Sequence, residues 1–179
     1  MTEAEIIKGC VDRNEVCQKL LFERYAGKML SLCQRYSRDQ QEAEDITQEG
    51  FLKVYDAIHQ FKFEGSFEGW VKRVFVSVAT RYVSKRKIIF SDIEHPGADV
   101  TTVDPTVVSK LSEDDIYRLI GRMPDGYRLV FNLNVIEGYS HEEIGKLLGI
   151  QASTSRTQLT KARRMLQSLI LKQFNVLSV

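Results

Sequence analysis

The feature that most constrains this chain is the spacing of its apolar residues. They recur every three or four positions through most of residues 4–87 and again through residues 111–172. This spacing is the period of an amphipathic α-helix, and no stretch shows the period-two alternation of a half-buried strand. The pattern therefore predicts an all-α protein.

The two periodic parts are separated by a stretch of different composition. Between Ser91 and Ser109 the chain contains Pro96-Gly97, Asp104-Pro105 and a run rich in Thr and Asp, without helical periodicity. Such punctuation is typical of a linker. We therefore expect two small helical domains, residues 1–90 and residues 111–179, joined by a flexible linker at residues 91–110.

The charge of the chain is unevenly distributed, although the net charge is only +1. Residues 1–90 contain fifteen Lys and Arg against thirteen Asp and Glu, residues 91–110 contain one against four, and residues 111–179 contain nine against seven. No acid lies between Glu68 and Asp92, and none follows Glu143. Two basic stretches, one in each half, suit contact with a single polyanion.

The start of the chain, its apolar runs and its cysteines and histidines argue against membrane insertion and against a bound metal or cofactor. The acidic start of the chain is unlike the basic start of a signal peptide, and no run of eighteen apolar residues occurs. We therefore expect a cytoplasmic protein without membrane insertion. Cys10, Cys17 and Cys33 form no CxxC pair, and the three histidines are scattered. We expect free buried thiols, no metal and no cofactor.

A helix predicted from about residue 41 has two different faces. Its apolar face carries Ala43, Ile46, Gly50, Val54, Ile58 and Phe61. Its opposite face carries Asp45, Gln48, Glu49, Leu52 and Asp56. An acidic face with one leucine is either a solvated surface or a docking face for a basic partner helix. An apolar stripe on the preceding helix, Leu21, Tyr25, Met29, Leu32 and Tyr36, is predicted to be core.

A second helix of the first half begins after a short loop that contains Phe63 and Gly65. Ser66 is its predicted N-cap. One side carries Phe67, Trp70, Val71, Val74, Phe75, Val78 and Tyr82, and another carries Arg73, Ser77, Thr80, Arg81 and Ser84. A face of hydroxyls and guanidiniums suits phosphates and bases. Phe63 and Trp70 are ambiguous, because aromatic residues at helical spacing form cores but also stack on unpaired bases beside a basic face.

The second half is predicted to form four helices. Residues 113–123 end at Pro124, and residues 126–137 end near Gly138. Ser140 to Glu143 form an S-x-x-E capping box, and the small residues Gly145 and Gly149 have the spacing of a helix-turn-helix. The helix that follows, about residues 152–171, contains no acid and presents Arg156, Thr157, Thr160, Lys161, Arg163 and Arg164. It is either a recognition helix or part of an ordinary helical hairpin with a solvated basic face.

Several of these segments match the motifs of one family. Residues 41–51 are similar to A-E-D-x-x-Q-E-x-F, and Phe61, Ser66-Phe67 and Trp70 resemble F-x-x-x-x-S-F-x-x-W. Residues 138–150 are similar to G-x-S-x-E-E-I-A-x-x-L-G-I, and residues 161–166 fit the segment after it. In this order, the motifs resemble regions 2 and 4 of the sigma-70 family of bacterial RNA polymerase sigma factors. The short linker, which leaves no room for other regions, resembles the extracytoplasmic-function (ECF) group.

The resemblance implies a non-enzymatic subunit that guides RNA polymerase to promoters. Its implied partners are core RNA polymerase, promoter DNA and an anti-sigma factor. Asp45, Gln48, Glu49 and Leu52 would bind the clamp helices of the largest polymerase subunit. Phe63, Ser66 and Trp70 would border the pocket for melted minus-10 bases, with Arg73, Ser77 and Arg81 on the contacting helix. Arg156, Thr157, Thr160, Lys161 and Arg163 would read and anchor the minus-35 element.

Four positions depart from the family pattern. Ser77 stands where Asn is common, and Gly69 stands where a larger residue is usual. Ser155 replaces the branched apolar residue that seats the recognition helix. Gln151 replaces a capping hydroxyl, which makes Ser153 the alternative N-cap.

Three other functions remain open on the sequence alone. One is a helix-turn-helix regulator that binds duplex DNA as a dimer, without core polymerase, and uses residues 1–90 as a sensor. Another is an enzyme that uses Cys33 or Asp45, although no nucleophile, base and orienting group are recognisable together. The third is an adaptor that mimics a sigma factor and occupies its partner.

Overall fold

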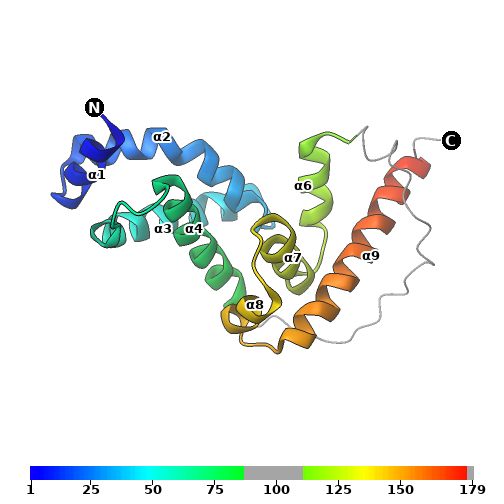
Figure 1. Cartoon of the computed structure of the whole chain (residues 1–179). Coiled ribbons are helices and arrows are strands. Elements are labelled where there is room, and N and C mark those ends of the chain that lie inside the picture. The colour runs from blue at the N-terminus through cyan, green and yellow to red at the C-terminus, as the bar shows by residue number, and fades with distance from the viewer. Residues whose placement is uncertain (87–110, 177–179) are drawn as a thin grey trace. The chain divides into compact units, whose positions relative to one another are not determined.

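The computed structural model describes residues 1–86 and 111–176 (Figure 1). Within these residues every regular element is a helix, so the predicted all-α class is confirmed. The chain divides into two compact units, Met1–Tyr82 and Val83–Val179. The expected linker at residues 91–110 lies outside the described residues.

The first unit is built from α1 (Glu3–Val11), α2 (Glu15–Gln34), α3 (Gln40–Ala57), the 3-10 turn η1 (Ile58–Gln60) and most of α4 (Phe67–Ser84). Short polar residues start each of the first three helices, because their side-chain oxygens accept hydrogen bonds from otherwise unpaired amides. Thr2 forms a capping box with Glu5, Asn14 accepts from the amide of Cys17, and Asp39 accepts from the amide of Glu42.

The core of this unit confirms the predicted helical stripes. Every member of the two predicted apolar stripes is buried, including Tyr36, which follows α2, and Ile58 and Phe61, which follow α3. The helices α3 and α4 approach closely at Gly50, where an added Cβ would lie 2.4 Å from Cε1 of Phe75. Glycine is therefore required there by packing. The three cysteines are buried and free, as predicted.

The second unit contains α6 (Glu113–Gly121), α7 (Asp125–Phe131), the π-turn η2 (Asn132–Ile136), α8 (His141–Leu148) and α9 (Ala152–Val176). The capping box predicted at Ser140 is present, with the Glu143 amide donating to Ser140 Oγ over 3.2 Å and the Ser140 amide donating back to Glu143 Oε2 over 2.8 Å. A similar box joins Ser112 and Asp115 at the start of α6. The long helix α9 packs against α6, α7 and α8 (Figure 1).

The helix predicted at residues 126–137 differs in detail from the observed one. It begins one residue earlier, at Asp125, and its last part is a π-turn in which the Glu137 amide donates to the Asn132 carbonyl over 3.0 Å. Apolar spacing does not distinguish these two helical forms over so short a stretch. The expectation of a helical segment ending near Gly138 is nevertheless confirmed, and Gly138 has a positive φ of 78°.

Candidate nucleic-acid and partner interfaces

The helix α3 presents its acidic face to solvent. Asp45, Gln48 and Leu52 are exposed and Glu49 is half-buried, while the opposite face of the helix is core. Leu52 leaves 66% of its surface exposed. The predicted docking residues therefore share one accessible surface with an apolar centre and carboxylates around it.

An aromatic cluster lies where the loop after η1 meets the start of α4. The ring centroids of Phe61 and Trp70 are 5.8 Å apart, those of Phe67 and Trp70 are 5.7 Å apart with nearly parallel planes, and those of Phe61 and Phe63 are 5.2 Å apart. Phe61 and Phe67 are buried, Trp70 is half-buried and Phe63 is 52% exposed. Trp70 is thus part of the cluster and also part of the surface.

The loop conformation holds Phe63 outward. Phe63 has a φ of 57°, in the left-handed region that a residue with a bulky side chain rarely adopts. Ser66 is exposed and caps α4, because its Oγ accepts from the amide of Gly69 over 3.3 Å. The N-cap predicted at Ser66 is confirmed. Phe63, Ser66 and Trp70 therefore meet at one end of α4.

Trp70 also heads a polar stripe that runs along α4. Residues at positions 70, 73, 77 and 81 follow the three- and four-residue spacing of one helix face. Arg73 and Arg81 are exposed and Ser77 is half-buried. Among the described residues no acid pairs with either arginine. The stripe thus combines an aromatic ring with two guanidiniums.

The charge of Glu68 at the start of α4 is balanced by two lysines. Lys28 Nζ donates to Glu68 Oε2 over 2.7 Å, and Lys72 Nζ lies 3.1 Å from Glu68 Oε1. These contacts lower the pKa of Glu68. Lys72 is therefore engaged with a carboxylate, and Arg73 and Arg81 carry the basic character of the polar stripe.

One residue of the predicted polar face is placed differently by the structure. Thr80 is buried, although the sequence put it beside Arg81. It lies one turn from Val76 and Val83, which are also buried, so this side of α4 is apolar. We therefore remove Thr80 from the accessible hydroxyls.

The second unit forms the predicted helix-turn-helix. Gly149 ends α8 in the left-handed conformation, with a φ of 68°. At Gly145 an added Cβ would lie 2.7 Å from the carbonyl oxygen of Ile150, so the absence of a side chain allows the turn to approach α8 this closely. The turn then delivers the chain into α9, which begins at Ala152.

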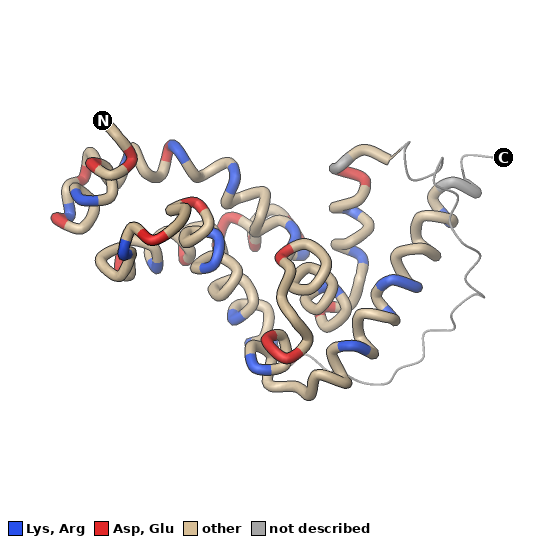
Figure 2. Tube along the Cα trace, in the orientation of Figure 1, with Lys and Arg blue, Asp and Glu red and all other residues tan. Residues whose placement is uncertain are grey.

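The helix α9 has one buried and one basic face. Leu159 and Ala162 are buried. Arg156, Thr157, Thr160 and Arg163 are exposed and Lys161 is half-buried. Figure 2 shows Lys and Arg but no Asp or Glu along this helix. The predicted recognition residues therefore share an accessible basic surface.

The alternative N-cap at Ser153 is wrong, because Ser153 lies inside the first turn of α9. The amide of Ser155 donates to the carbonyl of Gln151 over 3.1 Å, which makes Gln151 the residue at the start of the helix. The Ser153 hydroxyl instead donates to the Gln151 side chain over 3.3 Å.

Sequence reasoning missed two side-chain bridges between α8 and α9. His141 Nδ1 lies 2.9 Å from Ser155 Oγ, and Arg156 Nη2 donates to Glu142 Oε1 over 2.7 Å. A signal was present in the sequence, because a serine at the position of an apolar seat requires a polar partner once it is buried.

The described residues show no other recognisable chemical centre. None of their helices is long and apolar enough to cross a membrane. No three of their His, Cys, Asp or Glu residues are grouped so that they could hold a metal ion. The helix-turn-helix of α8 and α9 defines the chain as a DNA-binding protein.

Comparison with known proteins gives the family. Residues 21–88 match sigma-70 region 2 and residues 113–166 match sigma-70 region 4. The ECF RNA polymerase sigma factor SigW of Bacillus subtilis is 31% identical over 155 residues, which cover 80% of this chain and 83% of that protein. The ECF RNA polymerase sigma-E factor of Haemophilus influenzae is 26% identical over 183 residues, or 95% of this chain and 96% of that protein.

A solved structure has a similar fold. The sigma factor RpoE of Bartonella quintana, determined in complex with the anti-sigma factor NepR, is similar with a TM-score of 0.53 at 18% identity. That similarity covers 85% of this chain and 95% of the solved one. The chain belongs to the ECF group of the sigma-70 family, whose members direct RNA polymerase in transcription initiation. Sigma factors are initiation factors and not enzymes.

Proposed function

We propose that this sigma factor binds core RNA polymerase through the exposed face of α3. The proposal rests on Leu52, an exposed leucine bordered by Asp45, Gln48 and Glu49. An apolar centre with a charged border is the usual anatomy of a protein interface. The carboxylates favour a basic partner, which fits the clamp helices of the largest polymerase subunit that the family resemblance implies.

We assign minus-10 recognition to the aromatic cluster and the polar stripe of α4. Phe63, Ser66 and Trp70 would border the pocket for an unpaired base, and Arg73, Ser77 and Arg81 would contact the backbone and bases beside it. Unstacking a base costs a few kcal/mol, and stacking on an aromatic ring returns about 1–3 kcal/mol. The half-buried, supported ring of Trp70 suits this role, because little of its freedom is left to lose on binding.

We assign minus-35 recognition to the basic face of α9. A recognition helix enters the major groove with its N-terminal residues toward the base edges. In this chain those residues are Arg156, Thr157 and Thr160, followed by Lys161 and Arg163. The Thr157 and Thr160 hydroxyls donate to the carbonyls of Ser153 and Arg156 over 3.1 Å each. Each threonine therefore keeps its oxygen as an acceptor and its methyl group for contact with DNA.

We further propose that the chain has no catalytic activity of its own, acts in the cytoplasm and is regulated by an anti-sigma factor. Burial raises the pKa of the Cys33 thiol to about 11, so Cys33 is a poor nucleophile at neutral pH. The functional domains are proposed as residues 1–90 for core polymerase and minus-10 binding, and residues 111–179 for minus-35 binding, with residues 91–110 as the linker. An anti-sigma factor is consistent with the NepR complex of the structural relative.

Run-off transcription with purified core polymerase on a library of promoters tests the proposal. A sigma factor will yield transcripts from a subset of promoters that share two elements, and only when core polymerase is present. A duplex-binding regulator will bind DNA without core polymerase and yield no transcript. A sigma mimic will bind core polymerase and yield no transcript. The three functions therefore give three different combinations of binding and transcription.

A further inference from the structure

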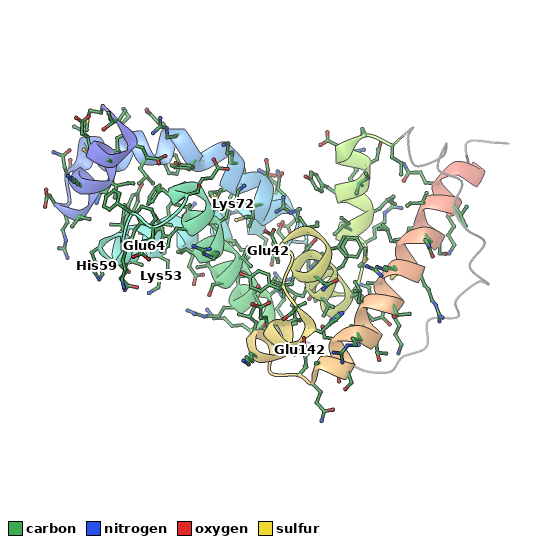
Figure 3. All side chains as sticks on the ribbon, in the orientation of Figure 1. Glu42, Lys53, His59, Glu64, Lys72 and Glu142 are labelled. Carbon is green, nitrogen blue, oxygen red and sulfur yellow. The ribbon has the colours of Figure 1, made fainter. Side chains whose placement is uncertain are left out.

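Two consecutive residues of α8 bridge to two consecutive residues of α9. His141 contacts Ser155 and Glu142 contacts Arg156, with 2.9 Å and 2.7 Å between the paired atoms. Figure 3 labels Glu142 at the start of α8, beside the first part of α9. The two bridges therefore join the first helix of the helix-turn-helix to the part of the recognition helix that meets base edges.

The buried bridge, between His141 and Ser155, holds the backbone of α9 at the residue before Arg156. Ser155 has 0% of its surface exposed, so its hydroxyl is sealed from water and depends on His141 for a side-chain partner. A branched apolar residue at this position would seat α9 by packing alone. Here a directional hydrogen bond does so, which sets the rotation of α9 relative to α8.

The exposed bridge, between Glu142 and Arg156, orients the Arg156 side chain but adds little to the free energy of unfolding. Both members of the Glu142–Arg156 pair are exposed, at 63% and 56% of their side-chain surfaces, and exposed ion pairs add little in water. A guanidinium has five N–H donors, and this contact uses the Nη2 end. The remaining donors are sufficient for the two parallel hydrogen bonds that an arginine makes to guanine.

The charge of the pair argues for base contact over phosphate contact. An arginine gains affinity from a phosphate by neutralising it and releasing counterions. Glu142 cancels that charge locally, and an ionised carboxylate near the backbone repels phosphate. Glu142 weakens a contact of Arg156 with a base edge less, since recognition there depends on the direction of the N–H donors.

We propose that Glu142 is a specificity-positioning residue of the minus-35 reader. It directs Arg156 to a guanine edge and keeps the guanidinium from moving to the nearest phosphate. The inference rests on the proposed role of α9 in duplex recognition and adds to it a residue outside the recognition helix. The preferred base at one minus-35 position is therefore set by the pair and not by Arg156 alone.

The test uses the reconstituted holoenzyme with promoters that carry each base pair at every minus-35 position. Glu142→Ala is expected to reduce the preference at one position by about tenfold, the lower part of the range for a bidentate contact. Affinity for the other sequences should stay equal or rise, and the salt dependence should steepen by about 0.9 in slope, because Arg156 then neutralises a phosphate. Asp114→Ala, which removes an exposed acid of α6, is the matched control. It should change neither the size of the base preference nor the minus-35 position at which it occurs.

A double-mutant cycle identifies the partner. Arg156→Ala should lose the same single-position preference, and adding Glu142→Ala to it should have no further effect on that preference. An unchanged preference profile in Glu142→Ala overturns the proposal, and so does a uniform loss of binding at every position together with a lowered melting temperature. Failure of the wild-type holoenzyme to transcribe any promoter would instead count against the proposed function itself.

Discussion

Among single residues, Arg128 of α7 is a buried charge that joins two helices. Its side chain is 1% exposed, Nη1 donates to the carbonyl of Gly121 over 3.0 Å, and Nη2 lies 2.5 Å from Asp125 Oδ1. These contacts join the end of α6 to the first turn of α7. The sequence did not single out this arginine, because apolar periodicity does not show where a charge is buried with its partners.

Replacing Arg128 should destabilise the second unit. Arg128→Ala removes a buried guanidinium that donates to Asp125 and to the Gly121 carbonyl. Asp125 keeps a second cation, because Arg86 Nη1 lies 3.6 Å from its Oδ2, so the expected loss is about 1.5–3 kcal/mol, the range for hydrogen bonds to a charged group. Denaturant unfolding of the full chain, followed by circular dichroism, measures it. The control is Arg118→Ala, because Arg118 is 76% exposed and lies 3.8 Å from Asp115, so we expect a loss under about 1 kcal/mol. Equal losses in the two variants would contradict the role of the buried pair.

The three cysteines lead to a chemical prediction. Burial raises the pKa of Cys33 and of Cys10 to about 11 each, so at pH 8 only about one thiol in a thousand is ionised at either site. Iodoacetamide should therefore label the native protein very slowly, with Cys33 the slowest, and should label all three cysteines rapidly in denaturant. Mass spectrometry of timed samples gives the rates. Rapid modification of Cys33 in the native protein would show that its surroundings open readily.

Residue-level expectations from the sequence failed where they depended on burial or on the residue at which a helix begins. Thr80 was assigned to a polar face by its own polarity, but its neighbours Val76 and Val83 share its buried side. Ser153 was offered as an N-cap, but the helix starts one residue before it. Ser155 was recognised as a departure from the family, whereas its partner His141 was not. Such pairings depend on how two helices cross, which a single sequence does not specify.

At the scale of elements, the two faces of α3 support different functions. The buried face fixes the helix in the core, so the exposed face can be changed without loss of structure. Asp45→Arg with Glu49→Arg should abolish binding to core polymerase, because the reversed charges repel a basic partner helix. Binding is measured by co-purification with core polymerase, and helical content by circular dichroism.

The matched control reverses two acids outside this face, Glu15→Arg and Glu23→Arg, both on α2 and both exposed in the structure. This variant carries the same charge change and should bind core polymerase normally. Retained binding of the Asp45 and Glu49 variant, with its helical content unchanged, would remove these residues from the docking surface.

The presence of the helices could be predicted because apolar spacing and capping motifs are local features of the sequence. Periodicity gave the helical segments, and the S-x-x-E box gave the start of α8. The π-turn at Asn132–Ile136 and the left-handed Phe63 were not predictable, because neither changes the apolar pattern. Loop conformation of this kind depends on contacts made after folding, such as the packing of Phe63 against Phe61.

At the scale of the whole molecule, the division into two helical halves has a direct test. The stretch from Ser91 to Ser109 contains Pro, Gly and Asp and lacks apolar periodicity, which favours proteolytic access. Limited proteolysis of the free protein should therefore cut there first and release two folded fragments. Fragment masses locate the cut and circular dichroism tests their folding. Early cleavage inside residues 66–87 would contradict the two-domain organisation.

The residues proposed for each surface could be chosen from the sequence, because their types and spacing match the family motifs. The sequence did not reveal that the Trp70 ring packs against the rings of Phe61 and Phe67 or that Arg156 is held by Glu142. Phe61 lies outside α4 and Glu142 lies outside α9, so neither of these two contacts follows from the spacing within one helix.

The two surfaces should respond differently when DNA opening is measured in the holoenzyme. Trp70→Ala removes a ring on which an unpaired base would stack, a contact that alanine substitution typically finds to be worth about 1–3 kcal/mol per base. We expect weaker promoter opening, read as reduced permanganate reactivity of unpaired thymines, with unchanged binding to minus-35 duplex DNA. Trp70→Phe keeps a stacking surface and should retain most of the opening.

Trp70 also packs on Phe61 and Phe67, so its loss affects the first unit as well as the DNA. The thermal melt of each variant must therefore accompany the permanganate assay. A purely structural tryptophan would lower the melting temperature and the opening together, and stabilising the variant by working at lower temperature would restore both. A tryptophan that stacks on DNA will leave opening defective at temperatures where the variant is fully folded, whereas normal opening in folded Trp70→Ala excludes the melting role.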